Sequence, residues 1–297
     1  MSQVPLGVLN VSANHLPLPL PALRTADFSH LTHLIIGELG YTWAQVEAVA
    51  GHLPRLTVLQ AFSNKIVEVS VSQGTFLQLE ELDLDGNPLA GWRQSVSPLN
   101  RIAKLRSLRL NGTGLTDIQL DDGSFPNLRS IQILDNGFSD WTSVGELNKL
   151  SVTDLRLRNC PLFAQTGDSE NCRSITIALI ASLEVLNSSG ITKAERRWAE
   201  IDYLKKHGGE YLRVKALADP AAMAEFSAAH GRYEEIVARH GEPQEGEDRV
   251  QVTTLSAMLV AVTVRCPEQP GAADTVKKLP TSMTVAKLKA LLHRLFK

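Results

Sequence analysis

The sequence contains few cysteines and no long apolar run. Its cysteines, Cys160, Cys172 and Cys266, are too few and too far apart for a disulfide framework, which favours a reducing compartment. The N-terminal segment lacks basic residues ahead of an apolar core, and no apolar run approaches the roughly 18 residues of a membrane-spanning helix. These absences predict a cytoplasmic protein with no membrane partner.

A surplus of positive charge is also absent. The chain has 30 Lys and Arg residues against 32 Asp and Glu residues, so its formal net charge is −2. Domains that bind nucleic acids usually carry a basic surplus that attracts the phosphate backbone. The charge balance therefore predicts no nucleic-acid partner.

Motifs of catalysis and ligand binding are missing as well. The eight histidines form no H-E-x-x-H motif and share no paired spacing with the cysteines that would predict a zinc site. The chain also lacks the phosphate-binding pattern G-x-x-x-x-G-K-[ST] and the nucleophile pattern G-x-S-x-G. We therefore expect no enzyme activity, no catalytic residue, no cofactor and no bound metal.

What the chain does contain is a repeat. Residues 79–89, LEELDLDGNPL, match the leucine-rich template L-x-x-L-x-L-x-x-N-x-L at every specified position. The same frame recurs at residues 6–16, 31–41, 56–66, 105–115, 128–138 and 152–162. Because the copies begin 23 to 26 residues apart, they predict an α/β solenoid in which a curved parallel sheet covers one continuous leucine core.

Two further positions recur with the repeat. At the asparagine position the chain turns inward, and an amide there can bond buried backbone groups. This position holds Asn14, Asn64, Asn87 and Asn136, the substitutes Thr113 and Cys160, and one departure at Leu39. Tryptophans follow it by four or five residues at Trp43, Trp92 and Trp141. Because they recur with the repeat, we expect them to pack on the convex side rather than to contact a ligand.

A helical cap is predicted after the repeats. We assign residues 1–190 to the repeats, residues 191–249 to a helical cap and linker, and residues 250–297 to a separate module. Thr192 and Glu195 form a capping box that predicts the start of a helix, and the pair Gly208–Gly209 predicts its end. The predicted buried face of this helix consists of Ala194, Trp198, Ile201 and Leu204.

The last module reads as two strands and a helix. Residues 258–266 and 274–279 flank a turn with proline and glycine, and their β-branched residues predict a hairpin. Thr284 is a good N-cap, and apolar residues recur after it at spacings of three and four as far as Leu295. Two strands and one helix are marginal alone, so we expect a partial αβ module.

The residues that flank the central leucine of each repeat strand are predicted to face outward on the concave side of the sheet. This face is apolar in the early repeats, acidic in the fourth and mixed later. Solenoids commonly bind partners on such a face, and the alternative is a face that is simply solvated. We favour a protein partner. The predicted contact residues are Ile35, Gln60, Phe62, Glu81, Asp83, Asp85, Arg109, Asn111, Asp154, Arg156 and Arg158.

Segments along nearly the whole chain resemble one family. They are LGVLNVSANHL (6–16), FPNLRSIQILDNGFSDWTSVGELNKL (125–150), LIASLEVLNSSGITKAERRWAEIDYLKK (179–206), FSAAHGRYEEIVARHGEP (226–243) and KKLPTSMTVAKLKALLHRLFK (277–297). The family is that of tubulin folding cofactor E, the tubulin-specific chaperone E, with its cofactor-E-like relatives. The last segment resembles the first half of the family's ubiquitin-like β-grasp domain. No segment matches the family's CAP-Gly domain, so we expect a chain that lacks it and has a truncated ubiquitin-like domain.

The resemblance implies a chaperone that acts by binding. It implies that the repeats engage α-tubulin, together with other tubulin folding cofactors, in assembly or disassembly of the α/β-tubulin heterodimer. It also implies a cytoplasmic, cytoskeleton-associated protein without enzymatic activity, whose ubiquitin-like part is a candidate contact for ubiquitin-pathway proteins. The alternative interpretation is a leucine-rich-repeat adaptor for another protein partner, such as a phosphatase or an axonemal complex.

Overall fold

The structure of the chain is a computed structural model that describes residues 6–14, 16, 28–50, 53–166, 169–243, 259–264 and 275–280. The chain divides into two compact units, Met1–Pro243 and Gln244–Lys297. The repeats and the helical cap lie in the first unit, and a β-hairpin lies in the second. Each unit is described by itself.

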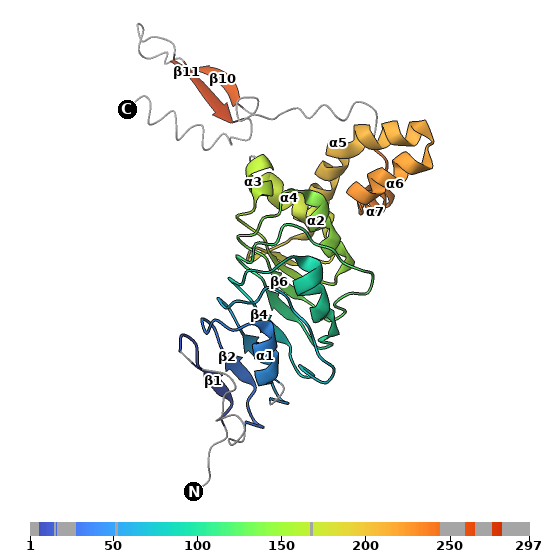
Figure 1. Cartoon of the computed structure of the whole chain (residues 1–297). Coiled ribbons are helices and arrows are strands. Elements are labelled where there is room, and N and C mark those ends of the chain that lie inside the picture. Colours follow the sequence, from blue (N-terminus) through green and yellow to red (C-terminus); the bar gives the residue numbers. More distant parts are fainter. Residues whose placement is uncertain are drawn as a thin grey trace. The chain divides into compact units, whose positions relative to one another are not determined.

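The first unit is built on a sheet whose described strands follow the order of the chain from β1 to β9. Strands β1 to β8 are parallel, and β9 pairs antiparallel with β8. The strands are Val8–Asn10 (β1), His33–Ile35 (β2), Val58–Gln60 (β3), Glu81–Asp83 (β4), Ser107–Arg109 (β5), Ser130–Gln132 (β6), Asp154–Arg156 (β7), Val185–Leu186 (β8) and Ser189–Gly190 (β9). This arrangement confirms the predicted α/β leucine-rich-repeat solenoid (Figure 1).

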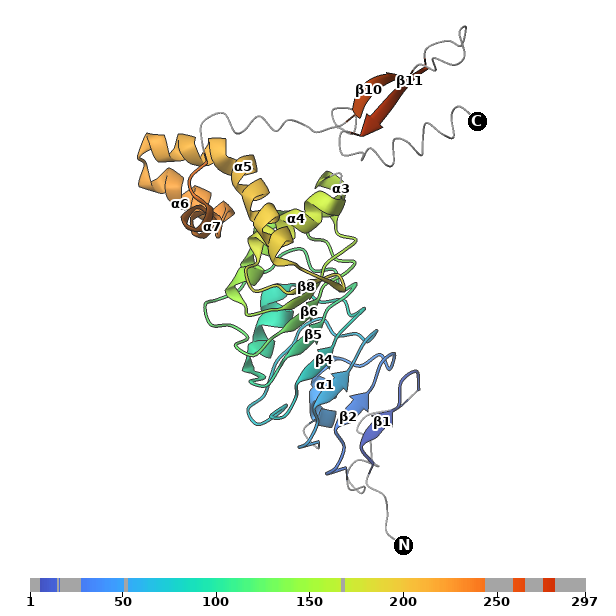
Figure 2. The same cartoon turned by 180° about the vertical axis from the view of Figure 1, so that it is seen from behind.

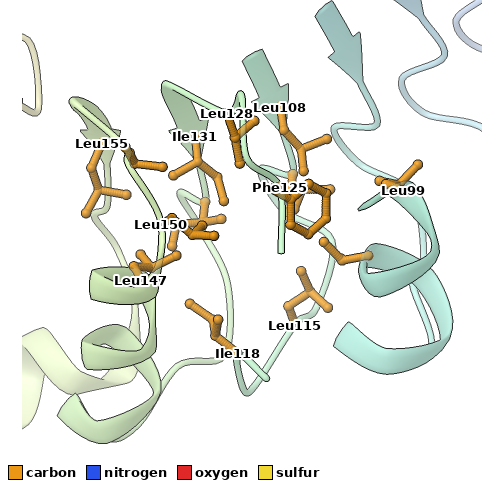
Figure 3. Close-up of a cluster of buried hydrophobic side chains, with 14 of the residues drawn as sticks. Leu99, Leu108, Leu115, Ile118, Phe125, Leu128, Ile131, Leu147, Leu150 and Leu155 are labelled. Atoms are coloured by element: carbon orange, nitrogen blue, oxygen red, sulfur yellow. The ribbon is translucent and has the colours of Figure 1, made fainter. Parts of the chain in front are cut away.

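Each strand from β2 to β7 sends its central residue into the core. These residues are Leu34, Leu59, Leu82, Leu108, Ile131 and Leu155, and none is more than 2% exposed. In Figure 3, the strand residues Leu108, Ile131 and Leu155 of neighbouring repeats lie side by side, and core residues from outside the strands lie below them. Burying one such side chain stabilises the fold by about 1.5–3 kcal/mol. The core therefore depends on stacked repeats, since no single repeat encloses it.

The turn after each strand has a common geometry. A residue with positive φ stands at the same place in seven repeats: Ala13, Glu38, Ser63, Gly86, Gly112, Asp135 and Asn159. The asparagine position follows, and the side chains of Asn64, Asn87 and Asn136 there bond the preceding repeat. Asn64 accepts hydrogen bonds from the backbone N–H groups of Leu39 and Tyr41, each at 3.0 Å. Asn64 thus provides a hydrogen-bond acceptor for the backbone N–H groups of the turn at Leu39, where the repeat departs from the template.

Short helices and turns cover one side of the sheet, as Figure 1 shows for α1 and α2 and Figure 2 shows from behind for α1. These elements are α1 (Trp43–Ala50), η2 (Trp92–Val96), η3 (Ser97–Arg101), α2 (Trp141–Gly145), η4 (Glu146–Lys149), α3 (Pro161–Thr166) and α4 (Ser169–Leu179). Trp43 and Trp92 are 3% and 1% exposed, and Trp141 is half-buried against the core. The prediction that the three tryptophans pack on the convex side is confirmed.

A helical cap follows the repeats. Its helices are α5 (Lys193–Leu217), α6 (Pro220–Ala229) and α7 (Tyr233–His240). Thr192 accepts a hydrogen bond from the Glu195 N–H at 3.1 Å, so α5 begins where the capping box predicts. Asp219 accepts a bond from the Ala221 N–H at 2.9 Å and starts α6 in the same way. In the part of the chain that the structure describes, no helix combines the length and apolar character needed to cross a membrane.

Two predictions about α5 are wrong. The helix does not end at Gly208 and Gly209 but continues for two more turns to Leu217, and Gly208 is buried inside it. A glycine costs only about 1 kcal/mol in a helix relative to alanine, so packing can override it. The predicted buried face is also displaced, because α5 contacts α4 as well as α6 and α7. Leu204 is buried as predicted and Ile201 is half-buried, but Ala194 is exposed and Trp198 is 72% exposed, whereas Tyr203 is buried.

The described part of the second unit is a hairpin of β10 (Leu259–Val264) and β11 (Thr275–Pro280). The strands pair antiparallel, with Leu259 opposite Pro280 and Val264 opposite Thr275. The hairpin predicted from residues 258–266 and 274–279 is confirmed. The predicted helix after Thr284 lies outside the described residues, and the ubiquitin-like assignment stays a prediction.

Candidate functional site

The predicted contact residues lie on one side of the sheet, which we call the strand face. The strand face consists of the outward-pointing side chains of β1 to β7 and those of the two residues that follow each strand. Backbone pairing sets them in rows across neighbouring strands. One row contains Ile35, Gln60, Asp83, Arg109, Gln132 and Arg156. Glu81 and Asp154 belong to a parallel row two residues earlier. The sheet therefore brings the predicted residues together as one surface.

Asp85 is the centre of a hydrogen-bonded cluster on this face. Its carboxylate accepts bonds from the Nη2 and Nε atoms of Arg109 at 2.6 and 3.1 Å. It also accepts bonds from the backbone N–H and the side-chain amide of Asn111, at 2.8 and 3.0 Å. The Asn111 side-chain oxygen in turn accepts the Leu134 N–H at 2.8 Å. This chain of bonds joins three successive repeats, so these polar residues help to hold the repeats together.

Asp83 lies beside the same cluster and is more enclosed than a contact residue should be. It is 7% exposed, its carboxylate accepts the Asp85 N–H at 2.9 Å, and it lies 3.3 Å from the Nε of Arg109. Burial raises the pKa of its carboxyl above the ordinary value, since the bond from Asp85 and the charge of Arg109 offset only part of that effect. Asp83 lies in the predicted row of the strand face but is largely enclosed, and its contact with a partner stays a prediction.

Arg109 is held as a cation by the two carboxylates. Burial alone would lower the pKa of its guanidinium, but the hydrogen bond to Asp85 and the charges of Asp83 and Asp85 outweigh burial and raise it. Arg109 of the fifth repeat therefore neutralises part of the negative charge that the sequence predicts in the fourth repeat. Glu81 is the exposed carboxylate that remains in β4.

The apolar end of the strand face has an internal contact of its own. A Cβ atom added to Gly37 would lie 2.3 Å from the Cε2 and Cζ atoms of Phe62. Only a glycine allows the ring to lie this close to the backbone of the preceding repeat. Phe62 and Ile35 are both half-buried, so Phe62 presents part of one ring surface to solvent while the other part packs on Gly37.

Strand β7 differs from β4 and β5 because its charged groups are not fully paired. Within the described residues, the Oδ1 atom of Asp154 and the Nε atom of Arg156 are buried without a hydrogen-bond partner. Buried polar atoms in native proteins nearly always have a partner. Arg158, two residues further on, is exposed. Arg158 also lines a hollow of about 580 Å³, whose other lining residues include Phe163, Thr176 and Asn187.

The sequence reading missed a buried charge cluster in the cap. Glu200 and Arg232 are 1% and 2% exposed. The Glu200 carboxylate accepts bonds from Arg232 at 3.1 Å and Arg239 at 2.9 Å, and it lies 2.7 Å from the Nε2 of His240. Arg232 also donates to the carbonyl of Ala178 in α4, which links the cap to the last repeat. The i, i+3 and i, i+4 spacing of Arg232, Glu235 and Arg239 was the available signal.

A scan against protein-family models gives no match to this chain. Among curated proteins, the chain is 34% identical over 305 residues to tubulin-specific chaperone E of Danio rerio and 33% identical over 306 residues to that of Homo sapiens. It is 27% identical over 311 residues to tubulin-folding cofactor E of Arabidopsis thaliana. Each of these matches covers 98% of this chain, and the chain spans 58% of the length of the first two relatives and 56% of the third. The resemblance predicted from the sequence segments is confirmed.

Two solved structures match parts of this chain. The leucine-rich-repeat protein LIC12759 of Leptospira interrogans matches 65% of this chain and 46% of its own, with a TM-score of 0.46 and 21% identity. A chain of the Drosophila melanogaster SNF/U2A′ complex matches 50% of this chain and 82% of its own, with a TM-score of 0.41 and 22% identity.

Proposed function

We propose that this chain binds tubulin through the strand face of its repeats and acts as a chaperone in assembly or disassembly of the α/β-tubulin heterodimer. The observation that carries the proposal is the 34% identity to tubulin-specific chaperone E over 98% of this chain, repeats and cap included. We infer that α-tubulin is the subunit engaged, that other tubulin folding cofactors are partners, and that the protein works in the cytoplasm in association with the cytoskeleton.

The mode of action is binding rather than catalysis. The sequence lacks the motifs G-x-x-x-x-G-K-[ST] and G-x-S-x-G, and the relative in Danio rerio is named a chaperone. Solenoid sheets offer extended surfaces that contact a folded partner over many repeats. On the strand face, the exposed charged side chains of Glu81 and Arg158 are the groups best placed to contact a partner.

The residues of the strand face divide into two roles under this proposal. Asp83, Asp85, Arg109 and Asn111 hold successive repeats in register and so keep the surface rigid. Ile35, Gln60, Phe62, Glu81, Asp154, Arg156 and Arg158 contribute the contact itself. A rigid surface loses less conformational entropy on binding, which favours affinity.

The second unit has a separate role in the proposal. We infer that residues 250–297 form part of a ubiquitin-like module that contacts ubiquitin-pathway proteins. A β-grasp domain begins with an antiparallel hairpin, and the antiparallel pairing of β10 with β11 supports this inference.

A binding assay with purified α/β-tubulin tests the proposal. We expect the chain to retain tubulin on analytical size exclusion or biolayer interferometry, and the double variant Glu81→Lys, Arg158→Glu to bind at least about tenfold more weakly, since reversed charges cost several kcal/mol against a complementary partner. Arg93→Glu is the matched control, because Arg93 is exposed on η2, away from the strand face.

The outcomes separate the alternatives. Failure of the wild-type chain to bind tubulin, with capture of a phosphatase or an axonemal protein instead, would replace the proposal with the adaptor interpretation. Tubulin binding that is weakened by Arg93→Glu and not by the double variant would place the contact on the helical side of the solenoid.

A further inference from the structure

Three potential metal ligands meet in the helical cap. Each of His207, Glu210 and His230 offers one ligand atom, and these three atoms all lie within 4.8 Å of one another. His207 and Glu210 are three residues apart in α5, so their side chains share one face of the helix. His230 is the residue that ends α6. The Nε2 atom of His230 lies 3.8 Å from a carboxylate oxygen of Glu210, and the two imidazole ring centres are 4.3 Å apart.

We propose that His207, Glu210 and His230 bind a divalent transition-metal ion of the zinc type. Two imidazole nitrogens and one carboxylate oxygen are a known three-ligand set for Zn²⁺, which takes water as its fourth ligand. Ligand atoms on one tetrahedral zinc ion lie about 3.3 Å apart, given metal–ligand distances of about 2.0–2.2 Å. The Glu210 side chain is half exposed, so it has room to move the remaining distance toward the histidines.

A hydrogen bond orients one of the ligands. The Nδ1 atom of His230 lies 2.7 Å from the hydroxyl of Tyr203, which leaves the Nε2 atom on the side of Glu210. Histidine ligands in metal sites nearly always bond a second group through the other ring nitrogen, because this fixes the ring orientation and the tautomer. When Nδ1 carries the proton and donates it to the Tyr203 oxygen, the lone pair of Nε2 is free for a metal ion. Tyr203 is buried, so its hydroxyl is held in place beside the ring.

The position of the site indicates its use. An ion held there would join the middle of α5 to the end of α6, beside the aromatic rings of Tyr203, Phe226 and Tyr233. It would thus fix the path of the cap helices rather than take part in a reaction. The three residues match neither the H-E-x-x-H motif nor a paired Cys/His spacing, because His230 comes from the end of the next helix.

Metal titration of the tag-free full chain tests the site. With Zn²⁺ in isothermal titration calorimetry we expect one ion per chain, and with Co²⁺ we expect visible absorption bands of four-coordinate intensity. The variants His207→Gln and Glu210→Gln should each weaken Zn²⁺ binding at least about tenfold and remove the Co²⁺ bands. His30→Gln is the control, since His30 is exposed in the repeats and should leave both signals unchanged.

Two results would overturn the proposal. One is no Zn²⁺ binding by a folded wild-type chain, which would mean that the three residues serve only the aromatic packing of the cap. The other is Zn²⁺ binding that both His207→Gln and Glu210→Gln retain at wild-type affinity, which would place the ion elsewhere. Because Glu210 is half exposed, Glu210→Gln should keep the native circular dichroism spectrum and so report on the ion alone.

Discussion

The guanidinium of Arg232 donates a hydrogen bond to the carboxylate of Glu200 at 3.1 Å, and the two side chains are 1% and 2% exposed. A buried ion pair adds little stability compared with an apolar pair of the same shape, but removal of one partner leaves an uncompensated charge. The pair joins α5 to the start of α7, and Arg232 also bonds Ala178 in α4. The cap therefore depends on both residues being present.

Arg232→Met should destabilise the fold by about 3–5 kcal/mol, because it leaves the Glu200 carboxylate buried with less compensation. Urea denaturation followed by circular dichroism measures this loss. Arg239→Met is the matched control. The Arg239 side chain is 46% exposed, so its bond to Glu200 is screened by solvent and its loss should cost below about 1 kcal/mol. Equal losses in the two variants would contradict the assigned importance of the buried pair.

The pH dependence of the cap follows from the same carboxylate. Burial alone would raise the pKa of Glu200, but the hydrogen bonds from His240 and Arg232 and the charges of Arg232 and Arg239 outweigh burial, so the pKa lies below its ordinary value. A group with a lowered folded-state pKa stabilises the protein above its unfolded-state pKa of 4.5 and loses that contribution as the pH falls through the folded value.

We therefore expect the free energy of unfolding to be insensitive to Glu200 between pH 7 and about pH 5 and to fall below about pH 4.5. Glu235, whose pKa is lowered chiefly by its hydrogen bond to Arg232, acts in the same direction. Denaturation curves at several pH values for the wild type and Glu200→Gln provide the check. The variant should be less stable at pH 7 and should lose less stability on acidification, and an identical acid loss in both proteins would refute the assignment.

The side chain at the asparagine position contributes differently to stability in different repeats. Asn87 accepts bonds from the Asn64 and Ile66 N–H groups at 3.1 and 3.2 Å and donates to the carbonyls of Ala61 and Leu84, each at 2.9 Å. Asn87→Ala removes the acceptor of the Asn64 and Ile66 N–H groups, whereas the carbonyls of Ala61 and Leu84 keep bonds from the Asn64 side chain and the Asn87 N–H. Since each unsatisfied N–H costs about 1–3 kcal/mol, we expect a loss of at least about 2 kcal/mol.

Asn14→Ala is the control for this prediction. Asn14 occupies the same place in the first repeat but is exposed, and its amide donates to the carbonyls of Val11 and Ser12 in its own turn. Its replacement should cost below about 1 kcal/mol. Thermal denaturation of the two variants compares them directly, and a loss at Asn14 as large as that at Asn87 would mean that the bonds between repeats are not the cause.

Asp85→Ala should lower the stability of the repeats, because Asp85 bonds neighbouring repeats. It removes the acceptor of Arg109 and of both Asn111 donors, so we expect a loss of about 1–3 kcal/mol in urea denaturation. Glu81→Ala, at an exposed position of the same repeat, should stay within about 0.5 kcal/mol of the wild type. If the two variants are equally stable, the Asp85 cluster does not hold the repeats together.

The repeat pattern predicted the strands from β1 to β7 because their spacing is a local property of the sequence, and Leu34, Leu59 and Leu82 lie in the core as expected. The hydrogen-bond partners and the exposure of the charged residues could not be predicted from the repeat spacing. Whether Asp85 meets solvent or Arg109 depends on the side-chain reach between neighbouring repeats, which appears only in three dimensions. The same holds for His207 and His230, which come from different helices.

The contact between Gly37 and Phe62 allows the apolar end of the strand face to be tested without deleting a contact residue. Gly37 does not have positive φ, so its backbone conformation accepts alanine. The added Cβ would lie 2.3 Å from the ring of Phe62, and the ring must therefore rotate away. Because the displaced atoms are the outer end of a half-buried side chain, the substitution should cost little stability. If Phe62 contacts tubulin as proposed, Gly37→Ala should weaken tubulin binding through the displaced ring.

A double-mutant comparison isolates this effect. Phe62→Ala should weaken tubulin binding, and Gly37→Ala added to it should change the affinity less than about twofold, because the ring that the methyl group displaces is already gone. Apparent Kd values for the wild type, both single variants and the double variant give the coupling. Wild-type affinity in Phe62→Ala would exclude the apolar end of the strand face from the contact and leave the charged residues of β4 and β7 as the binding surface. Additive losses in the double variant would show that Gly37→Ala acts on binding by a route other than the position of the ring.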